Sequence, residues 1–149
     1  PPIPEKIGFT TESVGGVVLD DVDATLTGFE GHGTTASPYL GIGYVHDGDG
    51  DKGGQKAVFK AKLPQAGSYE VRIGYSALGN RATNVPVVVR SAEGEKKILL
   101  NQKKKGSIDG FLEPVGVFRF EAGKDAVIEI SNEGTDGHVI VDAVQWVKK

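Results

Sequence analysis

The run Ser68-Tyr69-Glu70-Val71-Arg72-Ile73-Gly74-Tyr75 decides the fold class of this chain. Its apolar side chains fall at every second position, with polar residues or glycine between them. Successive side chains of a β-strand point to opposite faces, so this alternation predicts a strand with one face in a hydrophobic core. Residues 126–130 repeat the alternation, and residues 117–121 follow it less regularly.

Segments rich in Val, Ile, Tyr and Phe recur along the chain, and 22 glycines and 7 prolines fall largely between them, as in strands joined by turns. No segment shows sustained helical periodicity. We therefore predict an all-β protein that folds as an antiparallel β-sandwich of the jelly-roll type. The ten expected strands cover residues 16–20, 24–29, 39–45, 56–62, 68–75, 85–90, 96–100, 115–121, 126–131 and 139–147.

The chain length of 149 residues is that of one domain. Residues 1–14 begin with Pro1-Pro2-Ile3-Pro4 and are predicted to form an extended linker, because proline fixes φ and donates no backbone hydrogen bond. Residues 15–149 are predicted to form the β-sandwich, as a monomeric module. No apolar run approaches the ~20 residues that span a bilayer, so no membrane contact is expected.

Charge and composition exclude several functional classes. The net charge of −3 argues against nucleic-acid binding, for which a strongly basic surface is typical. The absence of cysteine excludes thiol catalysis, thiolate zinc sites and disulfides. No activated nucleophile and no fixed pair of acid and base groups can be recognised, so we expect no enzymatic activity.

The lengths of the connections point to one functional end. In a run of antiparallel strands, alternate connections emerge at the same end of the sandwich. Short turns at residues 64–67, 91–95 and 122–124 alternate here with long connections at residues 46–55, 76–84, 101–114 and 132–138. The four long connections should therefore share one end and carry the functional residues.

The connection at residues 76–84 is the leading candidate for ligand contact. The Arg81 guanidinium and the amides of Asn80 and Asn84 can hydrogen-bond sugar hydroxyls or a uronate carboxylate, and Tyr75 can stack on a sugar ring. In the alternative interpretation, the same side chains cap backbone groups and fix the loop, as asparagine does in turns.

A second candidate is the run Lys103-Lys104-Lys105, which we place at the same end together with Phe111. Three adjacent ammonium groups favour an anionic glycan through screened Coulomb attraction. The alternative is a solvated surface loop. His46 and His138 can approach each other at this end, although the three histidines are too scattered in sequence to indicate a metal site.

Asp47, Asp49 and Asp51 alternate with glycines, a pattern that can bring carboxylates together on a calcium ion. The segment is not an EF-hand, because Lys52 stands where that loop requires glycine and Val58 where it requires glutamate. A different oxygen site, completed by Asp109 or Asp136, and a flexible acidic loop are the two remaining interpretations.

Five stretches together resemble a known family. They are Val17-Val18-Leu19-Asp20-Asp21-Val22-Asp23-Ala24 and residues 64–71, 80–89, 115–123 and 141–146. In these stretches the chain resembles the golvesin C-terminal-like domain, also described as the xanthan lyase carbohydrate-binding-like domain of bacterial extracellular proteins. The most specific parts are Asn80-Arg81-Ala82-Thr83-Asn84 and Asp142-Ala143-Val144.

The resemblance implies a galactose-binding-domain-like jelly roll in a secreted or cell-surface bacterial protein. It further implies a non-catalytic module that targets an attached catalytic domain to a polysaccharide. The lysine run favours an anionic polysaccharide, with uronic or sulfated units. A structural spacer or protein-docking domain is the alternative.

Asp20 and Asp142 form a separate candidate metal site. Asp20 ends the first expected strand and Asp142 interrupts the apolar run of the last one. A buried carboxylate needs a partner. By analogy with jelly-roll carbohydrate modules that hold a structural calcium between their first and last strands, that partner is calcium. The alternative is hydrogen bonding to neighbouring backbone amides and hydroxyls.

Overall fold

The structure is a computed structural model that describes residues 16–149. The linker predicted at residues 1–14 lies outside the described residues. Within them the chain forms twelve β-strands and one three-residue 3-10 helix, and all pairs of neighbouring strands are antiparallel. None of the helical segments described is long and apolar enough to cross a bilayer. The prediction of an all-β antiparallel fold is confirmed.

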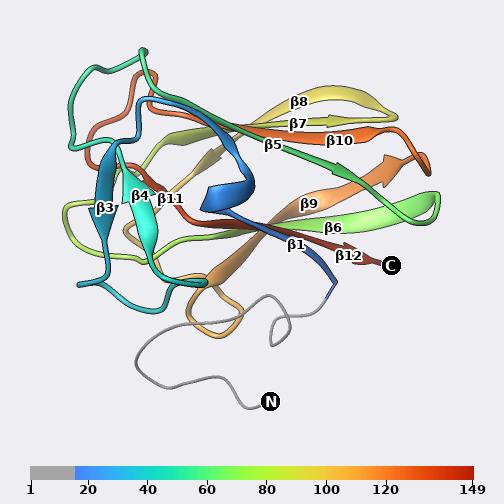
Figure 1. Ribbon diagram of the computed structural model, residues 1–149, viewed down its shortest axis with the longest axis horizontal. Helices are drawn as coiled ribbons and strands as arrows, with labels where there is room; N and C mark the ends of the chain where they lie inside the picture. The colour runs from blue at the N-terminus through green and yellow to red at the C-terminus, as the bar shows by residue number, and fades with distance from the viewer. Residues whose placement is uncertain (1–15) are drawn as a thin grey trace.

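Two sheets form the layers of a sandwich (Figure 1). The four-stranded sheet has the order β1 (Val17–Asp20), β12 (Ala143–Lys148), β6 (Gly67–Gly74), β9 (Leu112–Phe120). The five-stranded sheet has the order β2 (Thr25–Thr27), β5 (Lys56–Lys62), β10 (Asp125–Ser131), β7 (Val85–Ser91), β8 (Gly94–Leu100). A small third sheet has the order β11 (Ile140–Val141), β4 (Tyr44–His46), β3 (Gly31–Gly33).

The core lies between the two larger sheets. Val71 and Ile73 of β6 are fully buried, whereas Glu70 and Arg72 are only half-buried, as the alternation predicted. Val71 and Ile73 pack in one hydrophobic cluster with Phe59, Ile128 and Trp146. Removal of these apolar side chains from water is the main force that holds the layers together.

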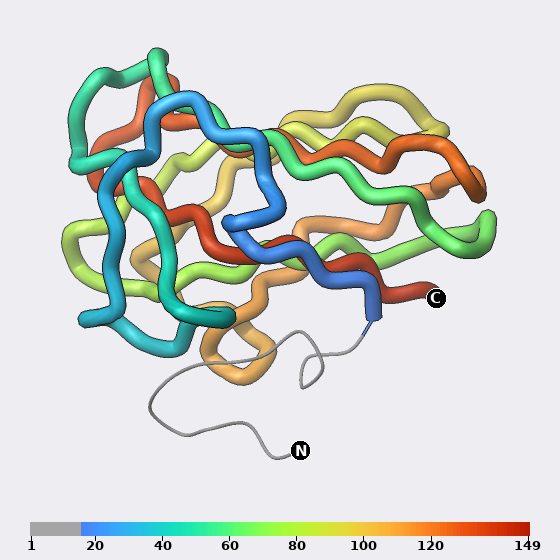
Figure 2. The backbone as a smooth tube through the Cα atoms, viewed as in Figure 1, coloured from blue at the N-terminus to red at the C-terminus, as the bar shows by residue number. Residues whose placement is uncertain are grey.

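The four long connections meet at one end of the sandwich, opposite the C-terminus (Figure 2). Backbone hydrogen bonds join them: the Ala82 amide donates to the His138 carbonyl at 2.8 Å, and the Gln102 amide to the Ala82 carbonyl at 2.9 Å. The Asp47 amide donates to the Val139 carbonyl at 3.3 Å. The end predicted from connection lengths is therefore present.

A second, smaller apolar cluster lies outside the sandwich, on the four-stranded sheet. Phe111 is fully buried there with Leu40, Leu112 and Ala143. Its ring packs so closely over Gly74 that a Cβ at this position would lie 2.6 Å from the Phe111 Cζ. Phe111 is thus a packing residue and offers no ring to a glycan.

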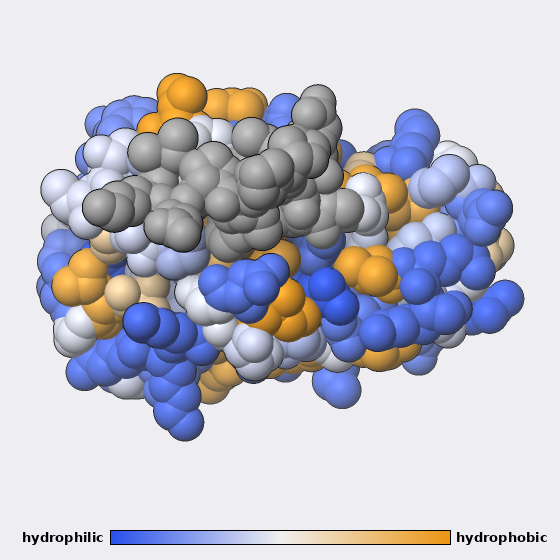
Figure 3. Space-filling model, turned by 90° about the horizontal axis from the view of Figure 1, so that it is seen from below, coloured by the Kyte–Doolittle hydropathy of each residue, from blue (hydrophilic) through white to orange (hydrophobic). Residues whose placement is uncertain are grey.

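The view from below shows mainly hydrophilic residues, with a few apolar groups between them (Figure 3).

The strands differ from expectation mainly around the small sheet. The run at residues 139–147 is divided at Asp142 into β11 and β12. The segment expected at residues 39–45 becomes a strand only at Tyr44, and β3 was not predicted. Strand β3 could not be predicted, because Gly31-His32-Gly33 has no apolar alternation and pairs with β4 through its backbone.

Candidate functional site

The β3–β4 hairpin builds the floor of a pocket at the loop end. Gly31 pairs with His46 and Gly33 with Tyr44, so the two rings and the two glycines share one face of the hairpin. The Tyr44 ring occupies the space above Gly33, where a Cβ would lie 2.6 Å from the Tyr44 Cζ. The His46 ring lies over Gly31 in the same way. Glycine in β3 therefore lets both rings lie flat across the strand.

Two of the long connections form the wall beside this floor. Arg81 and His138 make an isolated parallel bridge, in which the His138 amide donates to the Asn80 carbonyl at 2.9 Å. Gly137 allows this approach, because a Cβ there would lie 2.8 Å from the Arg81 carbonyl. The His138 ring lies edge-on to the His46 ring, with 6.1 Å between the ring centroids.

We call the resulting hollow, of about 460 Å³, the histidine pocket. All three histidines of the chain line it, and none of its lining residues carries a carboxylate. Its walls are His32, Gly33, Thr34, Thr35, Tyr44, His46, Asn80, Arg81 and His138.

Arg81 is the charged centre of the histidine pocket. Its side chain donates from Nε to the Ser76 carbonyl (3.0 Å), from one terminal nitrogen to Asn80 Oδ1 (2.8 Å) and from the other to Ser76 Oγ (3.2 Å). The guanidinium carbon lies 5.6 Å from the centre of the Tyr44 ring. Arg81 is only 5% exposed, yet it forms no ion pair within residues 16–149. The Arg81 side chain also interacts with the Tyr44 hydroxyl, an interaction that contributes to lowering the pKa of Tyr44. With these four partners, one of the five guanidinium N–H groups is left for a ligand.

The local hydrogen bonding fixes the state of His46. Its Nδ1 accepts a hydrogen bond from the Gly48 amide at 3.1 Å, so the neutral ring carries its proton on Nε2. Burial lowers the pKa of His46, the charges of His138 and Arg81 lower it further, and Asp47 opposes them. The ring is therefore a neutral hydrogen-bond donor at neutral pH.

Tyr75 does not present the stacking face that the sequence suggested. The residue is buried, and its hydroxyl donates to the Lys104 carbonyl at 2.5 Å. Burial, with a contribution from the charge of Glu113, raises the pKa of Tyr75 to about 12. The ring thus fixes the lysine-bearing connection from inside the protein.

Asn84 lies at the loop end but contacts the neighbouring connection. Its amide donates to the Gly134 carbonyl at 2.9 Å and accepts from the Asp136 backbone amide at 3.1 Å. The Asp136 carboxylate in turn accepts from the Thr83 backbone and hydroxyl. These contacts match the loop-fixing interpretation for Asn84. Arg81 also fixes the loop, through its hydrogen bonds to Ser76, and it lines the pocket together with Asn80.

The lysine run is exposed and lies apart from the pocket walls. Lys104 and Lys105 line a different hollow, of about 280 Å³, together with Tyr75 and Glu113. Lys103, Lys104 and Lys105 make no ion pair in the part of the chain that the structure describes. Their charges remain available at this end of the domain.

The aspartates at residues 47–51 do not converge on a metal position. The buried carboxylate of Asp47 accepts from the Val139 amide (3.0 Å), Asn132 Nδ2 (3.0 Å) and the Asp49 amide (2.9 Å). Lys52 Nζ lies 2.9 Å from the Asp47 carboxylate and 3.0 Å from that of Asp49. Burial raises the pKa of Asp47, but these donors hold it below its usual value. The Lys52 ammonium group thus lies between two of the carboxylates that were candidates for calcium binding. The third candidate, Asp51, is exposed.

Asp20 and Asp142 do come together, and Asp21 joins them. One carboxylate oxygen of each lies within 4.8 Å of the others, the one acidic cluster of this kind in residues 16–149. Asp142 is fully buried; its Oδ2 accepts from the Leu40 amide at 2.9 Å, and its Oδ1 has no hydrogen-bond partner. Asp20 Oδ1 accepts from the Asp21 amide at 2.7 Å.

This arrangement is electrostatically costly without a cation. Burial raises the pKa of Asp142, and the charges of Asp20 and Asp21 raise it further. Burial and the contact with Asp20 raise the pKa of Asp21 to about 8. Hard carboxylate oxygens, one of them buried without a partner, are the donors that Ca²⁺ prefers. The three residues can therefore hold a calcium ion.

Comparison with known proteins identifies the family. Residues 17–148 match the golvesin C-terminal domain. A xanthan lyase from Bacillus sp. (strain GL1) is 34% identical over 137 residues, which cover 88% of this chain and 14% of the lyase. The chain belongs to the golvesin C-terminal domain family.

Solved structures show the same fold. The golvesin C-terminal domain described here superposes on a Paenibacillus xanthan lyase with a TM-score of 0.82 and 33% identity, covering 89% of this chain and 13% of the lyase. The CBM35 of Paenibacillus barcinonensis has a TM-score of 0.61 at 20% identity, with 90% of this chain and all of that chain covered. The domain thus has the β-sandwich fold of a carbohydrate-binding module.

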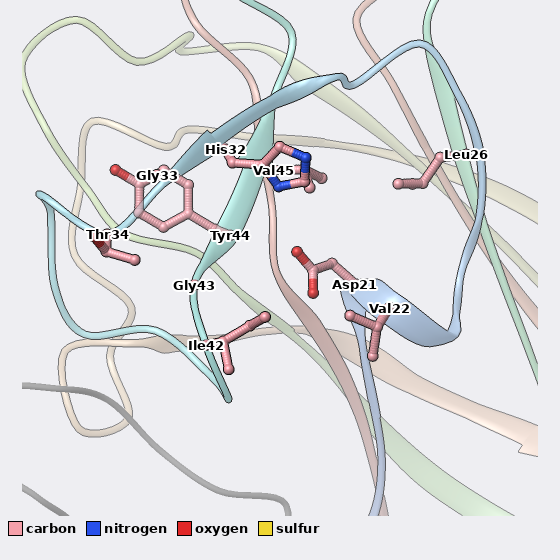
Figure 4. A pocket seen from close by; sticks show the side chains of 10 residues that line it. All are labelled: Asp21, Val22, Leu26, His32, Gly33, Thr34, Ile42, Gly43, Tyr44 and Val45. Atoms are coloured by element: carbon pink, nitrogen blue, oxygen red, sulfur yellow. The ribbon is translucent and has the colours of Figure 1, made fainter.

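A second hollow of this golvesin C-terminal domain lies between the 3-10 helix η1 (Asp21–Asp23) and the hairpin (Figure 4). Its volume is about 250 Å³, and it shares Tyr44 and His32 with the histidine pocket. Val22 and Ile42 on its rim are 70% and 86% exposed. The Asp21 carboxyl points from η1 toward β4.

Several residues of these sites have little signal in the sequence. Tyr44, His32, Thr34 and Thr35 belong to the weakly patterned segment before residue 46, which suggested no constellation. Asp21 was not predicted to join Asp20 and Asp142, because adjacent residues of a strand point to opposite faces. The strand instead ends at Asp20, and the turn of η1 brings Asp21 back toward it.

Proposed function

We propose that this domain is a non-catalytic carbohydrate-binding module and that the histidine pocket is its binding site. The observation that carries the proposal is a buried guanidinium that has no ionic partner among residues 16–149, beside aromatic rings at the shared loop end. Pockets with a few convergent polar groups and ring surfaces suit sugars. Because no carboxylate lines the pocket, it lacks the acid and base pair of a glycoside hydrolase.

An anionic glycan is the preferred ligand. The pocket offers hydrogen-bond donors: the guanidinium of Arg81, Nε2 of His46 and the Asn80 amide, whose Oδ1 already accepts from Arg81. A uronate or sulfate group supplies the matching acceptors and compensates the buried charge of Arg81. The exposed ammonium groups of residues 103–105 add long-range attraction at the same end.

The module would act by proximity. It raises the effective concentration of an attached enzyme at its polymer without taking part in the chemistry. The golvesin family match and the lyase relatives support a parent that is a secreted or cell-surface bacterial polysaccharide-degrading enzyme. Xanthan, named by the relative, is the first polymer to test.

Affinity electrophoresis of the isolated domain tests the proposal. The panel contains xanthan, polygalacturonate, its carboxyl-reduced neutral counterpart and a neutral mannan. We expect the two acidic polymers to retard the domain, and Arg81→Met to abolish the retardation. Arg119→Met, an exposed change on β9, is the matched control and should behave as the wild type. Unchanged mobility across the whole panel, with and without calcium, would remove the proposal.

We also propose a structural calcium ion at Asp20, Asp21 and Asp142. The unpartnered Oδ1 of Asp142 and the mutual repulsion of three carboxylates support it. The ion would join the end of β1 to the junction between β11 and β12. Its effect on ligand binding would be indirect, through the rigidity of the segment around Leu40.

Protein docking is the alternative function, and one observation favours it. Val22, Leu26 and Ile42 surround the apolar hollow and are all exposed. Because the chain spans only 14% of the lyase relative, an adjoining domain of the same polypeptide is the partner this surface would cover. Ile42→Asp should then loosen the contact between the two domains, as measured by limited proteolysis of the parent protein.

A further inference from the structure

The histidine pocket combines one permanent cation with three imidazole side chains. His32 comes from β3, His46 from β4 and His138 from the connection before β11. Arg81 stands beside them with no acidic partner in residues 16–149. Because the chain has three histidines, every imidazole of the domain lies in this one pocket.

The free pocket resists protonation of His46. The groups that act on His46 are His32, His138 and Arg81 across the pocket, with Tyr44 on its own strand and Asp47 as the next residue. Asp47 is the only acid among them, and Lys52 already neutralises it. Protonation at Nδ1 would also break the hydrogen bond from the Gly48 amide. A second positive charge beside Arg81 is therefore disfavoured while the pocket is empty.

An acidic ligand reverses this balance. A carboxylate bound to Arg81 places a negative charge among the imidazoles, where it attracts their protons and compensates the repulsion. Proton and ligand then favour each other's binding. Linkage requires this effect to be reciprocal, so a lower pH strengthens the binding of the acidic ligand by the same factor.

We propose that the histidine pocket takes up a proton when it binds an acidic sugar unit, so that affinity for acidic glycans rises as the pH falls below neutral. This inference rests on the proposed function of the same pocket. It adds a regulatory property: the module would attach most firmly to its polymer in acidified surroundings and release it as the pH rises.

Isothermal titration calorimetry with a galacturonate oligosaccharide tests the inference. Titrations at pH 5.5 and 7.5, at constant ionic strength, give the affinities. At pH 6.5, two buffers of different ionisation enthalpy give the number of protons taken up. We expect about fivefold tighter binding at pH 5.5, within the limit of about tenfold per pH unit for one proton, and a fractional proton uptake at pH 6.5.

Histidine variants separate proton coupling from a plain hydrogen-bond role. His46→Gln and His138→Gln should each reduce the ratio of the affinities at the two pH values. If a glutamine variant weakens binding equally at both pH values, that histidine acts only as a hydrogen-bond donor, and if both do so the inference is wrong. The wild type needs no substitution: its three imidazole proton signals should move toward the protonated position when the oligosaccharide is added at pH 7.

The outcomes distinguish this inference from the proposed function. Binding with the same affinity at both pH values and no proton uptake would overturn the inference and leave the carbohydrate-binding function intact. Absence of binding at every pH would overturn the proposed function, and the inference with it. Tighter binding at pH 5.5 with proton uptake supports both.

Discussion

The ammonium group of Lys52 lies 2.9 Å from the buried carboxylate of Asp47 and also donates to the Gly137 carbonyl at 2.7 Å. The same carboxylate accepts from the Val139 amide and from Asn132. Lys52 and Asp47 thus join the connection after β4 to the connection before β11, which carries His138. The position of the pocket wall depends on this pair.

Loss of Lys52 should loosen the loop end. Lys52→Met leaves the Asp47 carboxylate buried without a cation, so we expect a loss of about 1–3 kcal/mol in the free energy of unfolding. The lower part of the range applies because the lysine side chain is partly exposed. Urea unfolding measures the change. Lys60→Met, on the exposed face of β5, is the control and should change stability little. Equal stability of the two variants would show that the pair contributes nothing.

The sequence contained this arrangement only in part. The strand predicted at residues 56–62 has the observed bounds of β5, and the connection lengths indicated the shared loop end, because both depend on local sequence patterns. For the carboxylates at residues 47–51 the sequence suggested a calcium ion or a flexible loop, whereas Lys52 supplies the positive charge in the structure. The distance of Lys52 from Asp47 depends on how the loop closes over Gly137, a tertiary contact without a local signal. The burial of Tyr75 and Phe111 was not predicted either. An aromatic side chain near the end of a strand is equally compatible with a core and with a surface, so only the tertiary contacts decide between them.

Gly33 should be essential to the floor of the pocket. In Gly33→Ala the new Cβ would lie 2.6 Å from the Tyr44 ring. The ring must therefore move, which disturbs its contact with Arg81. We expect a loss of about 1–3 kcal/mol in stability from overpacking, and weaker glycan binding. Gly79→Ala is the matched control, because a Cβ there meets no atom within 4 Å. An unchanged affinity of Gly33→Ala would mean that the Tyr44 ring is not part of the binding surface.

Calcium should stabilise the domain through the acidic cluster. Adding calcium to the chelator-treated protein should raise the melting temperature, measured by differential scanning calorimetry, because the ion binds only the folded arrangement of Asp20, Asp21 and Asp142. Asp142→Asn should abolish the calcium response and should not destabilise the calcium-free protein, since the neutral amide still offers an oxygen to the Leu40 amide and avoids burying a charge there. Asp49→Asn, outside the cluster, should keep the response. A calcium response that survives in Asp142→Asn would place the ion elsewhere.

The contribution of His46 to the stability of the ligand-free domain should decrease as the pH falls below 6.5. His46 has a folded-state pKa below its ordinary value of 6.5, through burial and the charges of His138 and Arg81. Below pH 6.5 the imidazole at this position therefore binds a proton in the unfolded chain but not in the folded one, and its contribution to the free energy of unfolding decreases until the pH passes the folded-state pKa. Because the ring is partly exposed, we expect the decrease to stay below about 1 kcal/mol.

Urea unfolding of the wild type and His46→Gln at pH 7.5, 6.5 and 5.5 isolates this contribution. Groups common to both proteins, including Asp21, cancel in the difference between their stabilities. That difference should change in favour of the variant as the pH falls, and a saturating acidic oligosaccharide should reverse the trend, because the bound carboxylate favours the protonated ring. A difference independent of pH would show that His46 keeps its ordinary pKa in the folded domain.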